Sequence, residues 1–255
     1  MDIVVVTFNR WEYLRRCLAS LLDTTPETDR VIVVDNCSFD FTPKYLEMMR
    51  IKYPQRRLTV YRPKVNVGCA GGRNWGFDIS EKTGGREQEF IAMFDDDYSM
   101  RYDWRPLCME ALKSEDNIGL ATAHDDQCGG DKRIEEKQIR PGLTWFYKRN
   151  ITTSAAIIRR DAYRQVGGYR KSNKVLGWIS TDFCERLAAN GWRIISIRTF
   201  GGPAAENMDY KGSRFYRGDL YKQTGYVDFR KDAKAGQIDI GDDVTERFKF
   251  EIEEV

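Results

Sequence analysis

Histidine is nearly absent from this sequence. His124 is the only one among 255 residues, so a mechanism that needs two histidines is excluded. The six cysteines are scattered without CxxC spacing, which argues against a zinc site and a disulfide framework and for reduced thiols in a cytoplasmic protein. No apolar run approaches the length of a membrane span, and the chain opens directly into a predicted strand without a signal peptide. The net charge of +2 is close to neutral and does not indicate nucleic-acid binding.

Buried strands alternate with helices along the first half of the chain. The length fits one large domain, and the apolar fraction of 41% is typical of a soluble globular protein. Strand–helix alternation with nearly continuous apolar strands predicts an α/β fold with a mostly parallel central sheet flanked by helices. The expected helices include Pro43–Met49 and one that begins near Gly72. The expected strands are Ile3–Val6, Val31–Val34, Leu58–Tyr61, Phe90–Phe94, Ile118–Ala123, Thr153–Ile158 and Ile194–Ile197.

Three consecutive aspartates, Asp95, Asp96 and Asp97, follow directly on the apolar run Phe90–Phe94. Carboxylates packed together at the end of a buried strand repel one another and lose hydration. A divalent cation such as Mg²⁺ or Mn²⁺ would relieve both costs, because these ions prefer oxygen ligands. An isolated acidic triplet is equally typical of a solvated turn, so its surroundings decide between the two interpretations.

Polar segments follow four of the predicted strands. In an open parallel sheet, ligands bind beyond the carboxyl ends of the strands. The segments that lie there are Thr7–Arg10, Asp35–Ser38, Asn66–Asn74 and Asp95–Asp97. The sequence therefore predicts that four separate segments direct polar groups at one crevice.

The third of these segments is rich in glycine. Gly68, Gly71 and Gly72 let backbone N–H groups approach a ligand closely at a helix start, and Arg73 can add a bidentate contact to phosphate. Neither a GxGxxG fingerprint after the first strand nor a GK[ST] loop is present. On its own this segment is more typical of a glycine-rich turn with a helix cap.

Five segments match the motifs of one enzyme family, in order and at ordinary spacing, over roughly residues 3–200. They are Val4–Arg10 (against a strand and "TYNR"), Val33–Ser38 (against "VVDNxS"), Asn66–Gly76 (against "NxGxAxxRNxG"), Phe94–Asp97 (against "DxD") and Ile157–Tyr169 (against "RRxAFxxVGGF"). In this ordered set the chain resembles the family 2 glycosyltransferases, the inverting, nucleotide-sugar-dependent enzymes of the GT-A fold. The third segment is most similar to the rhamnosyl- and galactofuranosyl-transferase-like members.

The resemblance implies a role for each matching residue. Asp35 would hydrogen-bond the nucleotide base, and Arg73 would lie near the base or the diphosphate. Asp95 would face the ribose or the metal, and Asp97 would ligate a Mn²⁺ or Mg²⁺ ion that bridges the diphosphate. The residues expected to bind the nucleotide sugar are Thr7, Asn9, Arg10, Asp35, Asn66, Gly72, Arg73, Asp95 and Asp96, and those expected to bind the metal are Asp95 and Asp97.

The chain departs from the family at the general base, which an inverting transferase needs to deprotonate the acceptor. The family carries it in "EDxDLxxRL", where this chain has Ile179 and Ser180 at the first two positions. Asp182 falls on the second acidic position and is the expected catalytic residue. Asp182 and Glu185 also have the spacing of a helix capping box, which is the structural alternative.

A second departure concerns the metal. Many relatives supply a further ligand from a C-terminal histidine, which this chain lacks. Glu206, Asn207 and Asp209 are the oxygen ligands that the corresponding region offers, and His124 lies after a mid-chain strand. The Trp145–Tyr147 cluster is equally suited to stacking on sugar rings and to core packing.

These features together predict an inverting, metal-dependent glycosyltransferase that uses a nucleotide sugar, with UDP or dTDP favoured. Two alternatives stay open: a nucleotidyltransferase that forms sugar nucleotides, and a glycosyltransferase-like module that binds without turnover. The acceptor could be a glycan, a lipid-linked molecule, a protein or a nucleic acid. Residues 1–200 form the predicted GT-A domain, with a nucleotide-sugar half (1–100) and an acceptor half (101–200), and residues 201–255 form an irregular extension packed on it.

Overall fold

The structure is a computed structural model that describes the chain except for residues 55–56, 125–132, 171–177, 201 and 209–255. The Tyr- and Arg-rich extension therefore lies outside the described residues, apart from its first few positions. No helix in the described part of the chain combines the length and the apolar character that crossing a membrane requires.

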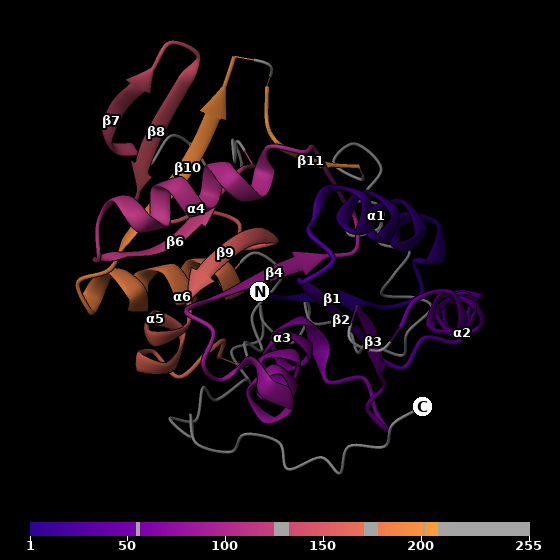
Figure 1. Ribbon diagram of the computed structural model, residues 1–255. Helices are drawn as coiled ribbons and strands as arrows, with labels where there is room; N and C mark the ends of the chain where they lie inside the picture. The colour runs from indigo at the N-terminus through magenta and orange to yellow at the C-terminus, as the bar shows by residue number, and fades with distance from the viewer. Residues whose placement is uncertain (55–56, 125–132, 171–177, 201, 209–255) are drawn as a thin grey trace, which may run out of the picture.

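The first half of the chain alternates strands and helices as its apolar pattern predicts (Figure 1). Its elements are β1 (Asp2–Thr7), α1 (Trp11–Thr24), β2 (Arg30–Asp35), α2 (Thr42–Lys52), β3 (Leu58–Tyr61), α3 (Gly68–Ser80), a π-helical turn η1 (Glu81–Gly85), β4 (Phe90–Asp95) and β5 (Tyr98–Met100).

The second half, as far as the structure describes it, holds two hairpin strands and four more strands beside its helices. Its elements are α4 (Trp104–Ser114), β6 (Ile118–Thr122), β7 (Arg133–Arg140), β8 (Leu143–Lys148), β9 (Ala155–Arg159), α5 (Arg160–Gln165), α6 (Trp178–Ala189), β10 (Arg193–Thr199) and β11 (Ala205–Asn207).

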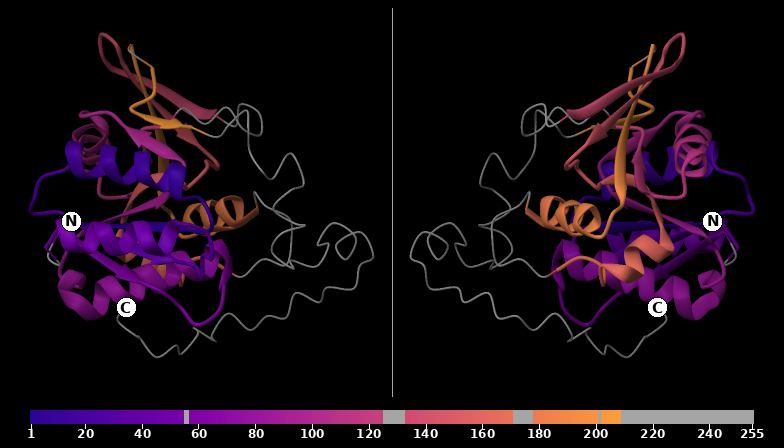
Figure 2. Two further views of the ribbon diagram at one scale, coloured as in Figure 1. Left: turned by 90° about the vertical axis from the view of Figure 1, so that its right-hand side faces the viewer. Right: turned by 90° about the vertical axis from the view of Figure 1, so that its left-hand side faces the viewer.

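Among the described residues, nine strands form one sheet in the order β3-β2-β1-β4-β9-β6-β10-β8-β7, and β5 pairs with β11 in a small second sheet. Strands β3, β2, β1 and β4 run parallel to one another. β9 runs antiparallel to both β4 and β6, and the β7–β8 hairpin is antiparallel to β10. Figure 2 shows this hairpin and β10 rising above the rest of the molecule.

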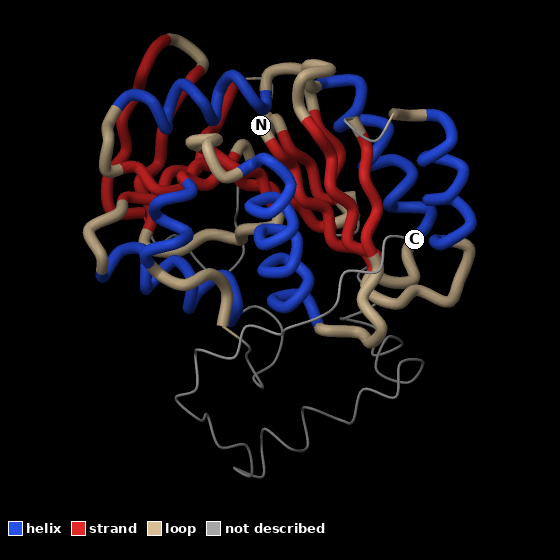
Figure 3. The backbone as a smooth tube through the Cα atoms, turned by 60° about the horizontal axis from the view of Figure 1, so that its bottom comes forward, coloured by secondary structure: helices blue, strands red, loops and turns tan. Residues whose placement is uncertain are grey.

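Helices cover both faces of the sheet (Figure 3). Ile3 and Val5 of β1 pack in one core cluster with apolar residues of α1, α2 and α4. Val4 and Val6 point to the opposite face and pack with residues of α3, α5 and α6. Because successive side chains of a strand point to opposite faces, a strand that is apolar at every position is buried on both sides.

Two glycines of α3 allow this helix to lie close to β1. A Cβ atom added at Gly72 would lie 2.7 Å from Cγ1 of Val6, and one added at Gly76 would lie 2.3 Å from Cγ1 of Val4. The helix begins at Gly68, four residues before the predicted start near Gly72, so Gly72 lies in its second turn. The structure thus gives Gly72 a packing role against the sheet.

The predicted fold class is confirmed, and all seven predicted strands are present. The Trp145–Tyr147 cluster belongs to β8 and is buried in the core, so the packing alternative is correct for it. Four of the described strands were not predicted: β5, β7, β8 and β11. The residues of β7 are nearly all exposed, most are charged, and they carry no apolar period.

The close contact between α3 and β1 makes Gly76→Ala a sharp test of the packing. We expect the free energy of unfolding to fall by about 1–3 kcal/mol, because an extra methyl group overpacks the interface. Urea denaturation followed by circular dichroism measures this change. Val4→Ala removes the clashing atoms, so the double variant should lose less stability than the sum of the two single variants. Additive losses would contradict the explanation.

Candidate functional site

The carboxyl ends of three neighbouring strands bring the predicted polar residues into one row. β1 pairs with β2 so that Thr7 lies opposite Asp35. On its other side β1 pairs with β4, where Val6 lies opposite Asp95. The residues predicted from separate segments are therefore adjacent in space.

The three aspartates differ in how far they are buried. The side chain of Asp96 is 4% exposed, whereas those of Asp97 and Asp95 are 13% and 29% exposed. Asp96 is turned inward, and its Oδ2 accepts a hydrogen bond of 2.6 Å from Oγ1 of Thr7. The carboxylates of Asp95 and Asp97 are less buried than that of Asp96.

Arg10 compensates the charge of two of these carboxylates. Its Nη1 lies 3.3 Å from Oδ2 of Asp97 and 3.5 Å from Oδ1 of Asp96. Burial raises the pKa of Asp96 to about 7, an effect that the neighbouring carboxylates add to and that Arg10 and Thr7 oppose.

Arg73 binds the carboxylate of Asp95. Its Nη2 donates a 2.6 Å hydrogen bond to Oδ1 of Asp95, and its Nη1 donates one of 2.9 Å to Oγ1 of Thr153. Ser154 accepts a further, longer bond, and the guanidinium lies 5.0 Å from the ring centre of Tyr169. Arg73 is almost fully buried, so it positions Asp95 from inside the protein.

Asp35 is buried at the end of β2. Its Oδ1 accepts a 2.9 Å hydrogen bond from the backbone N–H of Ser38, and Nη1 of Arg62 lies 3.5 Å from its Oδ2. Burial raises the pKa of Asp35, while Ser38 and Arg62 oppose this effect. Arg62 also donates to the carbonyl of Ser38, so it joins the end of β3 to the loop after β2.

Two of the predicted binding residues use their side chains to hold the surrounding loops. Oδ1 of Asn9 accepts a hydrogen bond of 2.7 Å from the N–H of Phe39, and the Asn9 backbone has a left-handed φ of 52°. Oδ1 of Asn66 accepts one of 2.9 Å from the N–H of Gly68 at the start of α3. Both asparagines therefore shape the site through its backbone.

The donor set fits a hard divalent cation that is only partly held by protein. In the part of the chain that the structure describes, no three His, Cys, Asp or Glu side chains are grouped so that they could hold a metal by themselves. Asp95 and Asp97 offer two accessible carboxylates, while Asp96 is turned away. Mg²⁺ and Mn²⁺ sites of this kind use one or two carboxylates and complete their coordination with water and substrate phosphates.

Residues 2–173 match the sequence pattern of the family described as Glycosyl transferase family 2. The chain belongs to this family. It is therefore a glycosyltransferase, and neither the nucleotidyltransferase nor the binding module that the sequence left open. A curated relative, the undecaprenyl-phosphate mannosyltransferase of Micrococcus luteus, is 25% identical over 207 residues, which are 76% of this chain and 80% of that protein. An uncharacterized glycosyltransferase of Haemophilus influenzae is 22% identical, over 65% of this chain and 53% of its own length.

Solved structures of similar fold are also glycosyltransferases. The mannosyltransferase PcManGT of Pyrobaculum calidifontis, in complex with GDP-Man and Mn²⁺, superimposes with a TM-score of 0.62 at 16% identity. The match covers 92% of this chain and 64% of that one, so this chain spans less than two thirds of its neighbour. TarS of S. aureus in complex with UDP-GlcNAc has a TM-score of 0.56 at 18% identity, with 85% of this chain and 63% of that chain covered. These likenesses confirm the GT-A fold.

Ser180, at the position where the family places its general base, is connected to Arg73 through Thr153. Ser180 stands at the second position of the family motif, where the family has an aspartate, and it lies on α6. Its Oγ is 2.9 Å from Oγ1 of Thr153 and accepts a 3.1 Å hydrogen bond from the Thr153 N–H. Thr153 in turn binds Arg73, and Arg73 binds Asp95. A chain of hydrogen bonds therefore connects the start of α6 with the end of β4.

Asp182 points to another side of the same helix. Two residues along an α-helix correspond to a rotation of about 200°, so Asp182 and Ser180 face nearly opposite directions. Oδ2 of Asp182 accepts a 2.9 Å hydrogen bond from Nε of Arg186, and Nη1 of Arg170 lies 3.6 Å from its Oδ1. Both carboxylate oxygens of Asp182 therefore lie beside guanidinium groups, and its role as the general base stays a prediction.

Asp182 does not cap helix α6. Helix α6 begins at Trp178, so Asp182 lies in its second turn and not at the N-cap. Arg186 extends the ion pair to the carbonyl oxygens of Val166 and Gly168, and Glu185 is exposed. In this arrangement Asp182 ties α6 to the loop after α5.

The segment expected near the metal does lie beside the aspartates. β11 pairs with β5 directly after the triplet, with Asn207 opposite Tyr98, and the N–H of Met208 donates a 2.7 Å bond to the carbonyl of Asp97. Glu206 is exposed, and Asp209 lies outside the described residues. The ring of His124 contacts the carbonyl of Ala205 at 3.2 Å, so it supports this strand.

Four residues of the site were not predicted: Arg62, Thr153, Ser154 and Tyr169. Arg62 directly follows β3, and its place at a strand end was the signal that could have identified it. Thr153 and Ser154 precede β9, whose antiparallel direction brings its start to the edge where the parallel strands end. No feature of the sequence marks that reversal.

The position of Asp182 can be tested with Asp182→Asn. We expect the free energy of unfolding to fall by about 1 kcal/mol, because a partly exposed ion pair is lost. Sugar transfer, measured with purified enzyme, should fall by less than tenfold. Glu185→Gln on the same helix is the matched control and should change neither quantity. A loss of about 10²–10⁴-fold in transfer with unchanged nucleotide binding would instead establish Asp182 as the general base.

Proposed function

We propose that this glycosyltransferase moves a sugar from a nucleoside diphosphate sugar to an acceptor hydroxyl, with inversion at the anomeric carbon and with the help of a divalent metal. The observation that carries the proposal is the arrangement at the end of β4, where Asp95 and Asp97 remain accessible while Asp96 is buried against Thr7. Relatives of similar fold were solved with GDP-Man and Mn²⁺ and with UDP-GlcNAc, which supports this choice of donor.

The nucleotide would occupy the row of strand ends. Asp35 would accept a hydrogen bond from the ring N–H of the base, since its carboxylate lies at the end of β2, opposite Thr7. A Mn²⁺ or Mg²⁺ ion held by Asp95 and Asp97 would act as a Lewis acid on the departing nucleoside diphosphate. Arg73 and Arg10 fix the two carboxylates in place, and Thr7 keeps Asp96 turned inward.

Inversion by a single displacement requires the acceptor to approach from the side opposite the diphosphate and to give up its proton. Asp182 is the carboxylate that the family pattern places where the proton would be accepted. The Asp182→Asn variant tests whether Asp182 is this base or only the ion-pair partner of Arg186. Hydroxyls of a glycan, a lipid-linked molecule, a protein or a nucleic acid would all meet this requirement. The proposal includes a reducing, cytoplasmic setting, in keeping with the free thiols of Cys17, Cys37 and Cys69 around the site.

Metal dependence is tested by Asp97→Ala. The variant should bind a nucleoside diphosphate in Mn²⁺ at least about tenfold more weakly than the parent protein, because one of two metal carboxylates is lost. Isothermal titration calorimetry with and without a chelator measures the difference. The matched control is Asp103→Ala, which removes an exposed carboxylate from the loop before α4. Equal affinity of the Asp97 variant and the parent protein in Mn²⁺ would show that the metal assignment is wrong.

Base recognition is tested by comparing nucleotides. Uracil and thymine present a ring N–H to Asp35, whereas cytosine has an acceptor at that position and would leave a buried carboxylate unpaired. This mismatch typically costs about 1–3 kcal/mol, so UDP or dTDP should bind about ten- to a hundredfold better than CDP. Asp35→Asn should reduce this preference, because an amide can also donate to cytosine. Equal affinity for all three nucleotides in the parent protein would exclude the role of Asp35.

A further inference from the structure

Exposed large apolar side chains are concentrated in one short stretch of the surface. Of eight such side chains among the described residues, four lie between positions 39 and 51. Phe39 is 69% exposed, Phe41 41%, Met48 56% and Ile51 83%. Single exposed apolar residues are common on protein surfaces, but a contiguous group of them marks an interaction site.

These side chains share one face of α2. Phe41, Lys44, Met48, Ile51 and Lys52 follow one another at helical spacing, so they lie on the same side of the helix. The opposite side is buried in the core through Tyr45, Leu46 and Met49. We call Phe39 together with these five residues the α2 outer face.

The two phenylalanines are held in place by other aromatic rings. Phe39 makes an edge-to-face contact with Phe8 at 6.0 Å, and Phe41 makes one with Trp11 at 5.2 Å. The backbone N–H of Phe39 is fixed by Oδ1 of Asn9. The aromatic end of the face is therefore preformed, and little conformational entropy is lost when it meets a partner.

Cations border the apolar residues. Lys44 lies over the ring of Phe41 and Lys52 over that of Tyr53, and neither lysine is within ion-pair distance of a carboxylate among the described residues. Figure 1 shows α1 beside α2 at the right of the molecule. The cations on these two helices are Arg15, Arg16, Lys44, Arg50 and Lys52, the acidic residues on them are Glu12, Asp23 and Glu47, and Asp40 lies two residues before α2.

We propose that the α2 outer face docks on an anionic lipid bilayer. Apolar side chains flanked by lysines suit the boundary between head groups and acyl chains, where the lysine stems lie along the apolar layer and the ammonium groups reach the phosphates. A second copy of the chain is the alternative occupant, and the oligomeric state in solution separates the two.

The position of the face gives the docking a consequence. Phe39 and Phe41 belong to the loop that follows β2, the same loop that carries Ser38 beside Asp35. A docked protein would hold this edge of the sheet near the membrane surface, where an acceptor carried on a lipid is presented. This consequence rests on the proposed function, whereas the docking itself does not.

The test is sedimentation with sucrose-loaded vesicles of phosphatidylglycerol and phosphatidylcholine in equal parts, beside vesicles of phosphatidylcholine alone. The full chain should bind the anionic vesicles and lose this binding at high salt. Lys44→Glu with Lys52→Glu should weaken binding by about tenfold or more, because each lysine near an anionic surface contributes about 1 kcal/mol. Phe39→Ser with Met48→Ser and Ile51→Ser should weaken it to a similar extent.

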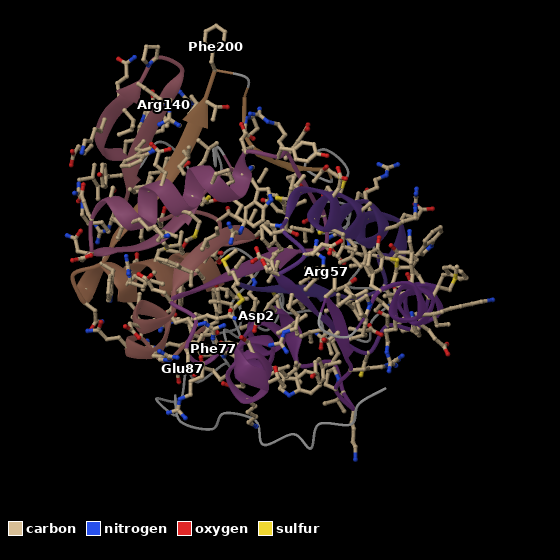
Figure 4. The ribbon with its side chains drawn as sticks, viewed as in Figure 1. Asp2, Arg57, Phe77, Glu87, Arg140 and Phe200 are labelled. Carbon is tan, nitrogen blue, oxygen red and sulfur yellow. The ribbon has the colours of Figure 1, made fainter. Side chains whose placement is uncertain are left out.

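The control is Ile134→Ser with Phe200→Ser, two side chains that are 72% and 96% exposed. Phe200 projects at the top of Figure 4, away from α2, so this variant should bind vesicles as the parent protein does. Thermal unfolding and nucleotide binding, measured on every variant, separate docking from folding and from the proposed activity.

Three results would overturn the proposal. The first is that the parent protein does not bind the anionic vesicles, and the second is that it binds phosphatidylcholine vesicles equally well. The third is a dimer, seen by light scattering, that the Phe39/Met48/Ile51 variant dissociates, since the face would then be covered by a second copy.

Discussion

The buried guanidinium of Arg73 is the group on which the rest of the site depends. It extends from α3 and binds Asp95 at the end of β4, Thr153 and Ser154 before β9, and the ring face of Tyr169. A planar group with several fixed donors can satisfy all of these partners at once, which a lysine ammonium cannot. A buried ion pair of this kind is weak evidence for stability, but it specifies one arrangement of the elements that it joins.

Arg73 also contributes to the charge balance of the site. Three carboxylates at the end of β4 lie beside two guanidinium groups, those of Arg10 and Arg73. Burial raises the pKa of Asp96 to about 7, and the neighbouring carboxylates add to this effect. Under the proposed function, a divalent cation held by Asp95 and Asp97 would add positive charge where the diphosphate binds.

The sequence predicted the parallel half of the fold well for a physical reason. Strands buried on both faces, such as β1 and β4, are apolar at every position, and their carboxyl ends collect the polar residues that follow them. The direction in which a strand runs cannot be predicted from its apolar pattern. β9 is as apolar as β1, but it runs antiparallel to β4. That reversal delivers Thr153 and Ser154 to the site, and because it cannot be read from the apolar pattern, neither residue was predicted.

Asp182 shows a different limit, that of helical phase. Matching a chain to a family motif assigns positions along the sequence, yet on a helix each step also turns the side chain by about 100°. Ser180 and Asp182 occupy neighbouring positions of one motif, but the first faces Thr153 and the second faces Arg186. The alignment therefore identified the correct helix, whereas only the structure shows which of its side chains is connected to Arg73 and the aspartates. In this chain it is a hydroxyl, so α6 contributes a hydrogen bond at the point where the family pattern places a carboxylate.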